Sequence, residues 1–406
     1  MVKKQENIIV GLDLGTTKVC AIVGEVKEDG RVDIIGIGIS PSLGLKKGVV
    51  VNIDSTVESV KKAVHDAELM AGVQIDSVYV GISGSHIKGI NSRGVVAIKN
   101  REVCQADVAR VIDAAKAVNI PMDQQILHVL PQEFIIDDQD GIKEPLGMFG
   151  VRLEAKVHII TGGVTSIQNI IKSCSRAGLK VNDLVLQPLA SSNAVLTQEE
   201  RDLGVVVMDI GGGTTDTALF LEGSLWHTEV LPIGGNHLTN DIAIGLRTPA
   251  SEAEKIKIKY GCALSSLVKP EEGLDVPSVG GRPPRQLSRQ ILAEIIEPRV
   301  EELFGMVQQR LKKTGFEDMF ASGIVLTGGT ALMEGIQEAA ERFLGLPIRR
   351  GTPKNIGGLM DVVNSPIYAT GVGLVLYGSE NQDQAPRRFR AGGLLNRLWK
   401  WLGEYI

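Results

Sequence analysis

A short motif rich in glycine and threonine occurs twice in this chain, and its repetition limits the folds that the sequence can adopt. The two copies are Asp13-Leu14-Gly15-Thr16-Thr17-Lys18 and Asp209-Ile210-Gly211-Gly212-Gly213-Thr214-Thr215-Asp216. Each copy directly follows an apolar run with the β-branched composition of a strand, at residues 8–14 and 205–210. The repeat therefore predicts two related halves, each with the same glycine-rich turn after its first strand.

The residue types in the repeat suit a phosphate chain. Glycines allow a tight turn whose backbone N–H groups converge on an anion, and threonine hydroxyls add donors. The aspartates that open the copies, Asp13 and Asp209, could hold Mg²⁺ through water. One such turn alone would as readily be an ordinary hairpin connection, but two copies that face each other would clamp a triphosphate. A third glycine-rich turn, Gly328-Gly329-Thr330, follows the strand-like residues 324–326 and strengthens the prediction of nucleotide binding.

Composition argues against several other classes of protein. The formal net charge of −5 disfavours bulk attraction to nucleic acid, because phosphate binding needs a basic face. The four cysteines are scattered without a Cys-x-x-Cys pair, so we expect neither a zinc site nor a disulfide framework, and a reducing cytoplasm. The first residues do not read as an export signal, and no apolar run reaches the roughly 18 residues of a spanning helix. P-loop and Rossmann fingerprints are missing as well.

In the order of its motifs, the sequence resembles the superfamily of actin, heat-shock chaperones and sugar kinases. Members have two phosphate hairpins and an adenosine turn, matched here by residues 13–18, 209–216 and 328–330. Residues 186–190 and 366–371 are similar to the two connectors that cross between the lobes in that superfamily. The resemblance covers residues 8–378 and implies an α/β actin-like ATPase fold, with two related lobes and a nucleotide cleft between them.

Within the superfamily, the sequence is most similar to the FtsA family of bacterial cell-division proteins. Members of that family replace the usual first-lobe insertion of the superfamily with a small subdomain placed elsewhere in the chain. The amino-acid composition changes at residues 83–161, which lie where this resemblance requires the subdomain. This segment has clustered glycines and a loop that contains Asp137, Asp138 and Asp140. We therefore expect a small α+β subdomain there. Further similarity lies in residues 11–18 and 234–243.

The resemblance also implies a set of residues that contact the nucleotide. Glu254 and Lys257 are three positions apart on one face of a predicted helix and would approach the adenosine, although a solvated charged face is an equally good interpretation. The other residues expected to bind ATP are Gly15, Thr16, Thr17, Lys18, Gly211, Gly212, Gly213, Thr214, Thr215, Gly234, Gly235, Asn236, Gly328, Gly329 and Thr330.

Hydrolysis is expected to be slow. The chaperones of the superfamily place a glutamate in the first connector to help position the attacking water, whereas this chain has Gln187 there, as actin does. A neutral amide can orient water but cannot accept its proton. With Asp13 and Asp209 as the other catalytic candidates, we expect ATP and Mg²⁺ to act more as a switch for conformation or assembly than as a rapidly consumed substrate.

The end of the chain carries a separate pattern. Residues 392–406 are predicted to form an amphipathic helix, because their apolar positions fall on one helical face, and basic residues occur from Arg387 to Lys400 without an acid among them. Two of the three tryptophans lie here, where indole rings suit a lipid headgroup boundary. A terminal helix packed on the protein's own core is the alternative, but the polar linker before it favours a reversible anchor on anionic lipid. The residues expected to bind the membrane are Leu394, Leu395, Arg397, Leu398, Trp399, Lys400, Trp401, Leu402 and Tyr405.

These interpretations divide the chain into lobes and insertions. The predicted boundaries are 1–82 and 162–196 for the first lobe, 83–161 for its inserted subdomain, 197–233 and 309–357 for the second lobe, 234–308 for an insertion in that lobe, 358–377 for a return to the first lobe, 378–391 for a flexible linker and 392–406 for the amphipathic helix. Within the second insertion, residues 269–285 contain prolines and glycines and are interpreted as an exposed loop.

By resemblance to the FtsA family, the chain is expected to polymerise like actin and to connect filaments of the tubulin-like GTPase FtsZ to the cytoplasmic face of the membrane at the division septum. The family places the FtsZ C-terminal tail near the predicted helix 288–304, where Arg289 and Arg299 could meet an acidic peptide. Other division proteins would bind residues 83–161. Two alternatives stay open: a rod-shape or pilus-assembly relative, and a small-molecule kinase, for which no carboxylate stands out as a base.

Overall fold

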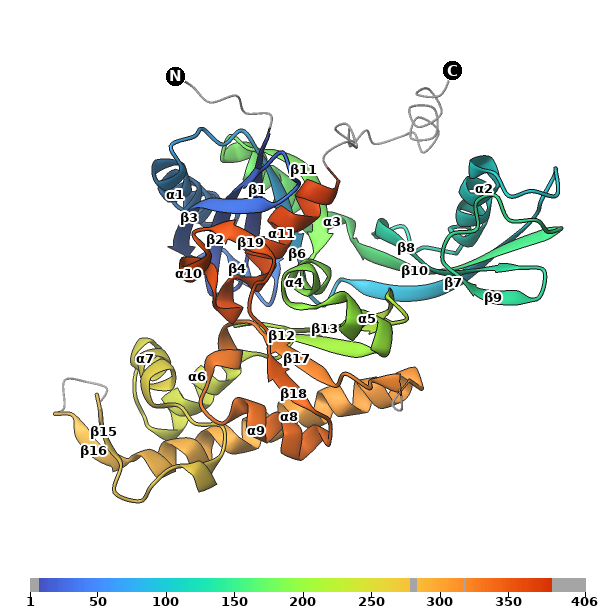
Figure 1. Ribbon diagram of the computed structural model, residues 1–406. Helices are drawn as coiled ribbons and strands as arrows, with labels where there is room; N and C mark the ends of the chain where they lie inside the picture. Colours follow the sequence, from blue (N-terminus) through green and yellow to red (C-terminus); the bar gives the residue numbers. More distant parts are fainter. Residues whose placement is uncertain (1–6, 278–282, 317–318, 382–406) are drawn as a thin grey trace.

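Two lobes joined by crossing helices, with a smaller subdomain projecting to one side, make up the molecule (Figure 1). The computed structural model describes residues 7–277, 283–316 and 319–381. The predicted amphipathic helix and most of the predicted linker lie outside these residues.

Each lobe is built on a β-sheet, and the two sheets share one topology. The first sheet has the order β11-β6-β1-β2-β3-β19 and the second β14-β13-β12-β17-β18. The strands of the first sheet are β1 (Ile8–Leu14), β2 (Lys18–Val26), β3 (Val32–Pro41), β6 (Ser77–Ile82), β11 (Lys180–Leu186) and β19 (Ile356–Gly358). The strands of the second sheet are β12 (Val205–Ile210), β13 (Thr215–Leu221), β14 (Ser224–Leu231), β17 (Ile324–Thr327) and β18 (Ile348–Arg350).

The shared topology extends the sequence repeat to the whole sheet. In the first lobe, β1 pairs antiparallel with β2 and parallel with β6. In the second lobe, β12 pairs antiparallel with β13 and parallel with β17 in the same way. All residues of β12 and β13 are buried, as expected for strands covered on both faces. Both glycine-rich motifs therefore form the turn of the hairpin that opens each lobe.

Helices cover both faces of the first sheet. On one face lie α1 (Ile53–Ala71) and α3 (Val164–Arg176), and on the other lie α4 (Gln187–Val195) and α11 (Ala369–Glu380). Because α4 also packs against β12, β13 and β17, these two helices connect the lobes (Figure 1). They correspond to the two connectors expected from the sequence. The remaining short elements of the lobes are β4 (Leu45–Lys46), β5 (Val49–Val50), α5 (Gln198–Leu203), α9 (Ile336–Leu344), α10 (Met360–Val363) and the 3₁₀ turns Gly329–Leu332 and Pro366–Tyr368.

The crossing of α4 and α11 depends on a glycine. A Cβ atom on Gly373 would overlap the carbonyl oxygen of Ala190. We expect Gly373→Ala to lower the free energy of unfolding by about 1–3 kcal/mol, because the helices would have to separate. Gly305→Ala is the control, since Gly305 is also helical but has no atom within 4 Å of its Cβ position, and it should raise stability by about 0.5–1 kcal/mol. Urea denaturation measures both, and stabilisation by both substitutions would refute this account of the crossing.

The inserted subdomain has a core of its own. A sheet of order β7-β10-β8-β9 is covered by α2 (Gln105–Ala115), and its strands are β7 (Lys88–Ala97), β8 (Gln124–Ile136), β9 (Gln139–Ile142) and β10 (Arg152–Gly163). Although the insert leaves the first lobe after β6, it also contacts the edge strand β14 of the second lobe. Gln132 donates from Nε2 to the carbonyl oxygens of Leu225 and Trp226, each at 3.3 Å. The insert therefore touches both lobes.

The second-lobe insertion consists mainly of helices. They are α6 (Gly235–Gly245), α7 (Ala250–Tyr260), the 3₁₀ turn Ser265–Leu267 and α8 (Arg289–Thr314), with a hairpin of β15 (Gly273–Val276) and β16 (Arg285–Ser288) between them. The hairpin corrects the interpretation of 269–285 as a loop. Leu274 and Val276 alternate with polar positions and are buried in the core of the lobe, a pattern masked by the neighbouring glycines and prolines.

Two predicted helix boundaries also differ from the structure. Helix α8 continues past residue 304 to Thr314 and ends where Gly315 adopts a left-handed conformation with φ 74°. Helix α11 runs to Glu380, so residues 378–380 are helical where a linker was predicted. Gly378 is buried, and the Tyr377 hydroxyl donates to Asp183 at 3.2 Å, so packing on the first sheet extends this helix.

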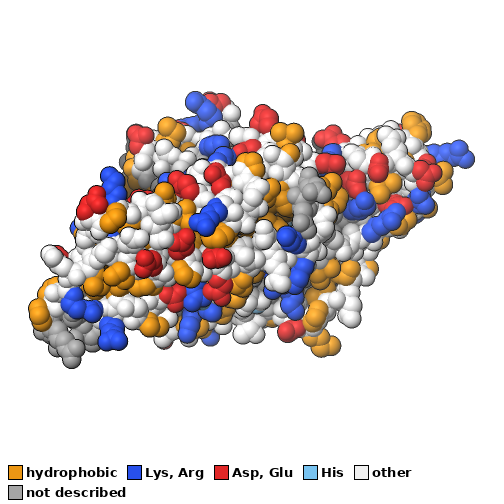
Figure 2. Space-filling model, turned by 90° about the horizontal axis from the view of Figure 1, so that it is seen from below, with side chains coloured by type: hydrophobic (Ala, Val, Ile, Leu, Met, Phe, Trp, Pro, Cys, Tyr) orange, Lys and Arg blue, Asp and Glu red, His pale blue; other side chains and the backbone are white. Residues whose placement is uncertain are grey.

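Among the described residues, no helix combines the length and hydrophobicity needed to cross a membrane. Figure 2 shows the molecule from below the view of Figure 1, and over the described part of this face acidic and basic side chains are interspersed with apolar ones. This mixture agrees with the small net charge of the sequence.

Candidate functional site

The turns of the two hairpins lie against each other between the lobes, where the sequence predicts the nucleotide cleft. Gly15 donates its N–H to the Lys18 carbonyl at 3.0 Å, and Gly211 donates to the Thr214 carbonyl at 2.9 Å, so the two turns close in the same way. A Cβ atom on Gly212 would overlap the hydroxyl of Thr17, and glycine is therefore required where the turns approach. A Cβ atom on Gly213 would lie 2.5 Å from the hydroxyl of Thr16, which is also too close. The structure thus brings the two predicted phosphate hairpins together.

The third glycine turn and the start of α6 pack onto the second hairpin. Gly235 donates its N–H to the Gly211 carbonyl at 2.9 Å, and Asn236 donates to the Gly212 carbonyl at 2.7 Å. A Cβ atom on Gly234 would also meet these carbonyls. The Thr330 hydroxyl contacts the Gly211 carbonyl at 3.4 Å. These segments line one wall of the cleft, together with Gly328 and Gly329.

Gly328 has a backbone conformation that favours glycine. Its φ is 85°, and a Cβ atom there would overlap the carboxylate of Asp209. The adjacent Thr327 donates its hydroxyl to the Pro366 carbonyl at 3.2 Å, which ties the third turn to the second connector. The backbone of this turn can therefore approach the second hairpin closely.

The predicted adenosine pair, Glu254 and Lys257, lies on α7 beside the start of α6. Lys257 Nζ is 2.7 Å from Glu254 Oε2 and donates to the Gly235 carbonyl at 3.0 Å. The Lys257 side chain is only 10% exposed. It therefore does not belong to a solvated charged face, which was the alternative interpretation, but joins α7 to the wall of the cleft.

The cleft contains three buried carboxylates, those of Asp13, Asp209 and Asp216. Asp13 accepts a hydrogen bond from Gln187 Nε2 at 3.0 Å, and Asp209 accepts one from the Thr370 hydroxyl at 3.0 Å. Gln187 thus reaches the first hairpin from the first connector. Lys18 points to the second connector, where Nζ donates to the Ile367 carbonyl at 2.5 Å.

Burial raises the pKa of all three carboxyls. Burial raises the pKa of Asp13, although the nearby Lys18 opposes this effect. Burial, reinforced by the charge of Asp13, raises the pKa of Asp209 to about 6. Burial also raises the pKa of Asp216 to about 7, despite the hydrogen bond that it accepts from the Ser83 hydroxyl at 2.5 Å.

Asp216 is the last residue of the second copy of the repeated motif, but it was not among the expected site residues. A signal existed, because Asp216 on β13 pairs directly with Asp209 on β12 in the hairpin register. Asp216 also accepts a hydrogen bond from Ser83, which directly follows β6 of the first lobe. Asp216 therefore bridges the lobes across the cleft.

The donor set fits a hydrated divalent cation better than a directly ligated one. Among the described residues, no cluster of three or more His, Cys, Asp or Glu side chains could hold a metal ion. Buried carboxylates with raised pKa values nevertheless favour a nearby cation, which would relieve their repulsion. Magnesium commonly keeps several waters and takes only one or two carboxylates together with phosphate oxygens.

The two arginines predicted to bind a partner are occupied by acids of the same chain. Arg289 pairs with Glu272 at 2.6 Å and also with Glu334, and its side chain is 14% exposed. Arg299 pairs with Asp241 at 2.6 Å and also with Glu302. A peptide that engages either arginine must therefore compete with these contacts.

Comparison with known proteins decides the family. Residues 84–161 match the family model of the SHS2 domain inserted in FtsA, and residues 206–373 match that of cell division protein FtsA. The chain is 54% identical to cell division protein FtsA of Pseudomonas aeruginosa over 405 residues, which is 97% of each chain. It is 48% identical to FtsA of Escherichia coli (strain K12) over 408 residues, again 97% of each. The chain belongs to the FtsA family of cell-division proteins.

Solved structures confirm the actin-like fold of this FtsA-family chain. A chain of the PilM-PilN type IV pilus biogenesis complex superposes with a TM-score of 0.66 at 16% identity, covering 91% of this chain and 98% of that one. MreB 5 of Spiroplasma citri bound to AMPPNP gives a TM-score of 0.54 at 15% identity, covering 93% and 98%. The pilus and rod-shape alternatives therefore share the fold, whereas the full-length identity is with FtsA.

Proposed function

We propose that the cleft of this FtsA-family chain binds ATP with Mg²⁺. The convergence of two equivalent glycine hairpins with a third glycine turn carries this proposal, and AMPPNP in the MreB 5 neighbour supports it. The residues that would hold the phosphates are Gly15, Thr16, Thr17, Lys18, Gly211, Gly212, Gly213, Thr214 and Thr215. Those that would border the adenosine are Gly234, Gly235, Asn236, Glu254, Lys257, Gly328, Gly329 and Thr330.

The bound cation would supply charge neutralisation for the phosphates, and Asp13 and Asp209 would hold its waters. Gln187 is engaged with Asp13, and its amide has no basic lone pair with which to take a proton from water. The chain's own residues are therefore suited to binding and closing on a nucleotide more than to rapid hydrolysis. ATP then acts mainly as a switch between arrangements of the lobes.

We further propose that the chain polymerises and tethers FtsZ filaments to the cytoplasmic face of the membrane at the septum. Family membership supports the tether, and the MamK double helical filament, with a TM-score of 0.52, shows that this fold occurs in filaments. The C-terminal segment with Trp399 and Trp401 supplies the composition of a lipid anchor. Other division proteins would contact the inserted subdomain.

The FtsZ tail is placed by this proposal on the helical insertion of the second lobe. Exposed apolar side chains lie there on α6, α7 and α8, namely Ile244, Ile258 and Ile291. Because Arg289 and Arg299 already have acidic partners, an acidic tail would have to exchange one carboxylate for another there.

Vesicle sedimentation tests the tether. We expect the full chain to carry FtsZ onto anionic vesicles, and a chain that ends at Asn381, just after α11, to leave both proteins in the supernatant. Leu398→Glu should act like the truncation, because it places a charge on the apolar face. Asn396→Glu, with a similar added charge on the polar side, should retain more binding. Equal pelleting of the truncated and full chains would rule out the C-terminal anchor.

A further inference from the structure

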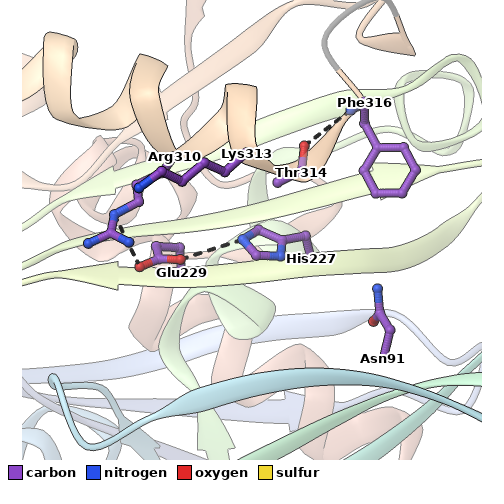
Figure 3. A pocket seen from close by; sticks show the side chains of 7 residues that line it. All are labelled: Asn91, His227, Glu229, Arg310, Lys313, Thr314 and Phe316. Carbon is purple, nitrogen blue, oxygen red and sulfur yellow. Dashed lines mark hydrogen bonds and ion pairs between the residues drawn. The ribbon is translucent and has the colours of Figure 1, made fainter.

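A pocket of about 210 Å³ lies between the inserted subdomain and the second lobe, and none of its lining residues belongs to the cleft (Figure 3). One wall is Asn91 on β7 of the insert. The opposite walls are His227 and Glu229 on β14, and Arg310, Lys313, Thr314 and Phe316 on and just after the end of α8. The pocket is thus formed by two parts of the molecule that meet only through folding.

The permanent charges in the pocket are two cations and one carboxylate. Glu229 lies 3.7 Å from Arg310 and 3.6 Å from His227. Contact with His227 lowers the pKa of Glu229, and the charges of Arg310 and Lys313 add to this effect, so Glu229 is ionised at neutral pH. Lys313 is exposed and forms no ion pair with any residue in the described part of the chain. Among the charges of the described residues that line the pocket, one positive charge therefore remains unmatched.

The uncharged walls are held in fixed positions. The ring of Phe316 packs edge-on against Trp226, with their centroids 5.6 Å apart, and offers an apolar surface. Asn91 Oδ1 faces away from the pocket and contacts His158 Nδ1 at 2.6 Å and Gln132 Nε2 at 3.4 Å. The amide nitrogen of Asn91 consequently points into the pocket as a donor (Figure 3).

This combination selects a particular class of ligand. An unmatched ammonium, a guanidinium and an amide donor suit a carboxylate, and the adjacent phenyl ring suits an apolar side chain next to it. The charges alone would attract a phosphate as well, and it is the apolar ring of Phe316 beside them that favours a peptide carboxylate over inorganic phosphate. We propose that this pocket is a docking site for an acidic peptide segment of a partner protein, with a carboxylate between Arg310 and Lys313 and an apolar side chain against Phe316.

Because Asn91 belongs to the insert and the other lining residues belong to the second lobe, a bound peptide would link these two parts. This assignment goes beyond the proposed ATP site and FtsZ surface, and it depends on neither of them. The exposed ends of Arg310 and Lys313 also make the residues suitable for substitution, since neither side chain supports the core.

The test measures fluorescence anisotropy of the full chain with a labelled peptide of glutamates around a central leucine. We expect Lys313→Glu and Arg310→Glu to weaken binding about tenfold or more, because each reverses a charge at the ligand. Lys312→Glu is the matched control: the residue is the exposed neighbour on the same helix, carries the same charge and does not line the pocket. It should weaken binding much less, and equal losses for Lys312→Glu and Lys313→Glu would overturn the proposal.

A second variant should act in the opposite direction. Glu229→Gln removes the pocket's own carboxylate and should tighten binding several-fold, whereas Glu301→Gln, on an exposed part of α8, should change it little. The same peptide with glutamine in place of glutamate should not bind. If inorganic phosphate competed with the peptide at similar strength, the pocket would be a phosphate site and the proposal would be refuted. If the Lys313 variant lost self-association instead of peptide binding, the pocket would bind a second copy of the chain, which would also refute it.

Discussion

Replacing Asp209 by asparagine is expected to weaken Mg²⁺-dependent ATP binding about 10- to 100-fold while making the ligand-free protein more stable. The carboxylate is 7% exposed, and burial together with the charge of Asp13 raises its pKa to about 6. Above that pH the folded chain holds a charge that the unfolded chain solvates better. Asparagine removes this penalty, worth about 1–3 kcal/mol, but it also removes the negative charge that would hold the waters of Mg²⁺.

The opposite signs of the two effects make the experiment decisive. Isothermal titration with ATP and Mg²⁺ gives the affinity, and chemical denaturation without nucleotide gives the stability. A variant that loses binding through misfolding would be less stable, not more. Asp113→Asn removes a partly exposed carboxylate from α2 in the insert and should leave ATP affinity unchanged. Unchanged ATP affinity in the Asp209 variant would remove the two-hairpin clamp as the nucleotide site.

The glycine hairpins were predictable because their signals are local. A strand, a glycine turn and a second strand follow each other within a few residues, and the repeat of this unit indicates that two lobes face each other. The connectors follow from the same order of motifs, and the structure places Gln187 at the first hairpin. The residues of the cleft that could be named from sequence are therefore mostly those that shape its backbone.

Contacts between distant segments could not be predicted in the same way. Arg289 and Arg299 resemble free surface arginines in the sequence, and only the fold places Glu272 and Asp241 beside them. Lys257 resembled a solvated lysine until α7 packed beside α6. Glu272 is 17 residues from Arg289, Asp241 is 58 residues from Arg299, and the Gly235 carbonyl is 22 residues from Lys257, and no periodic pattern marks these three partners. The pocket lined by Asn91, Glu229 and Lys313 could not be predicted either, because its walls come from three separate elements.

Asp216→Asn should stabilise the ligand-free protein increasingly as pH rises. Burial raises the pKa of Asp216 from 3.8 to about 7, so the folded chain holds this proton more tightly than the unfolded chain does. The carboxyl therefore costs nothing below about pH 4, and its destabilising effect grows until about pH 7 and then levels off. The asparagine variant lacks this group, and its stability advantage over the natural chain should rise from near zero to about 2–4 kcal/mol across that range.

The difference between the two chains is the quantity to measure, because other groups also titrate in this range. Burial lowers the pKa of His158 to about 3, so this residue makes both chains more stable as pH rises to about 6.5 and would hide the effect in either curve alone. Subtraction cancels it. Urea denaturation at pH 4, 6 and 8 is expected to show a growing gap; a constant gap would mean that Asp216 is ionised throughout and that the Ser83 hydroxyl, 2.5 Å away, outweighs burial in setting its charge.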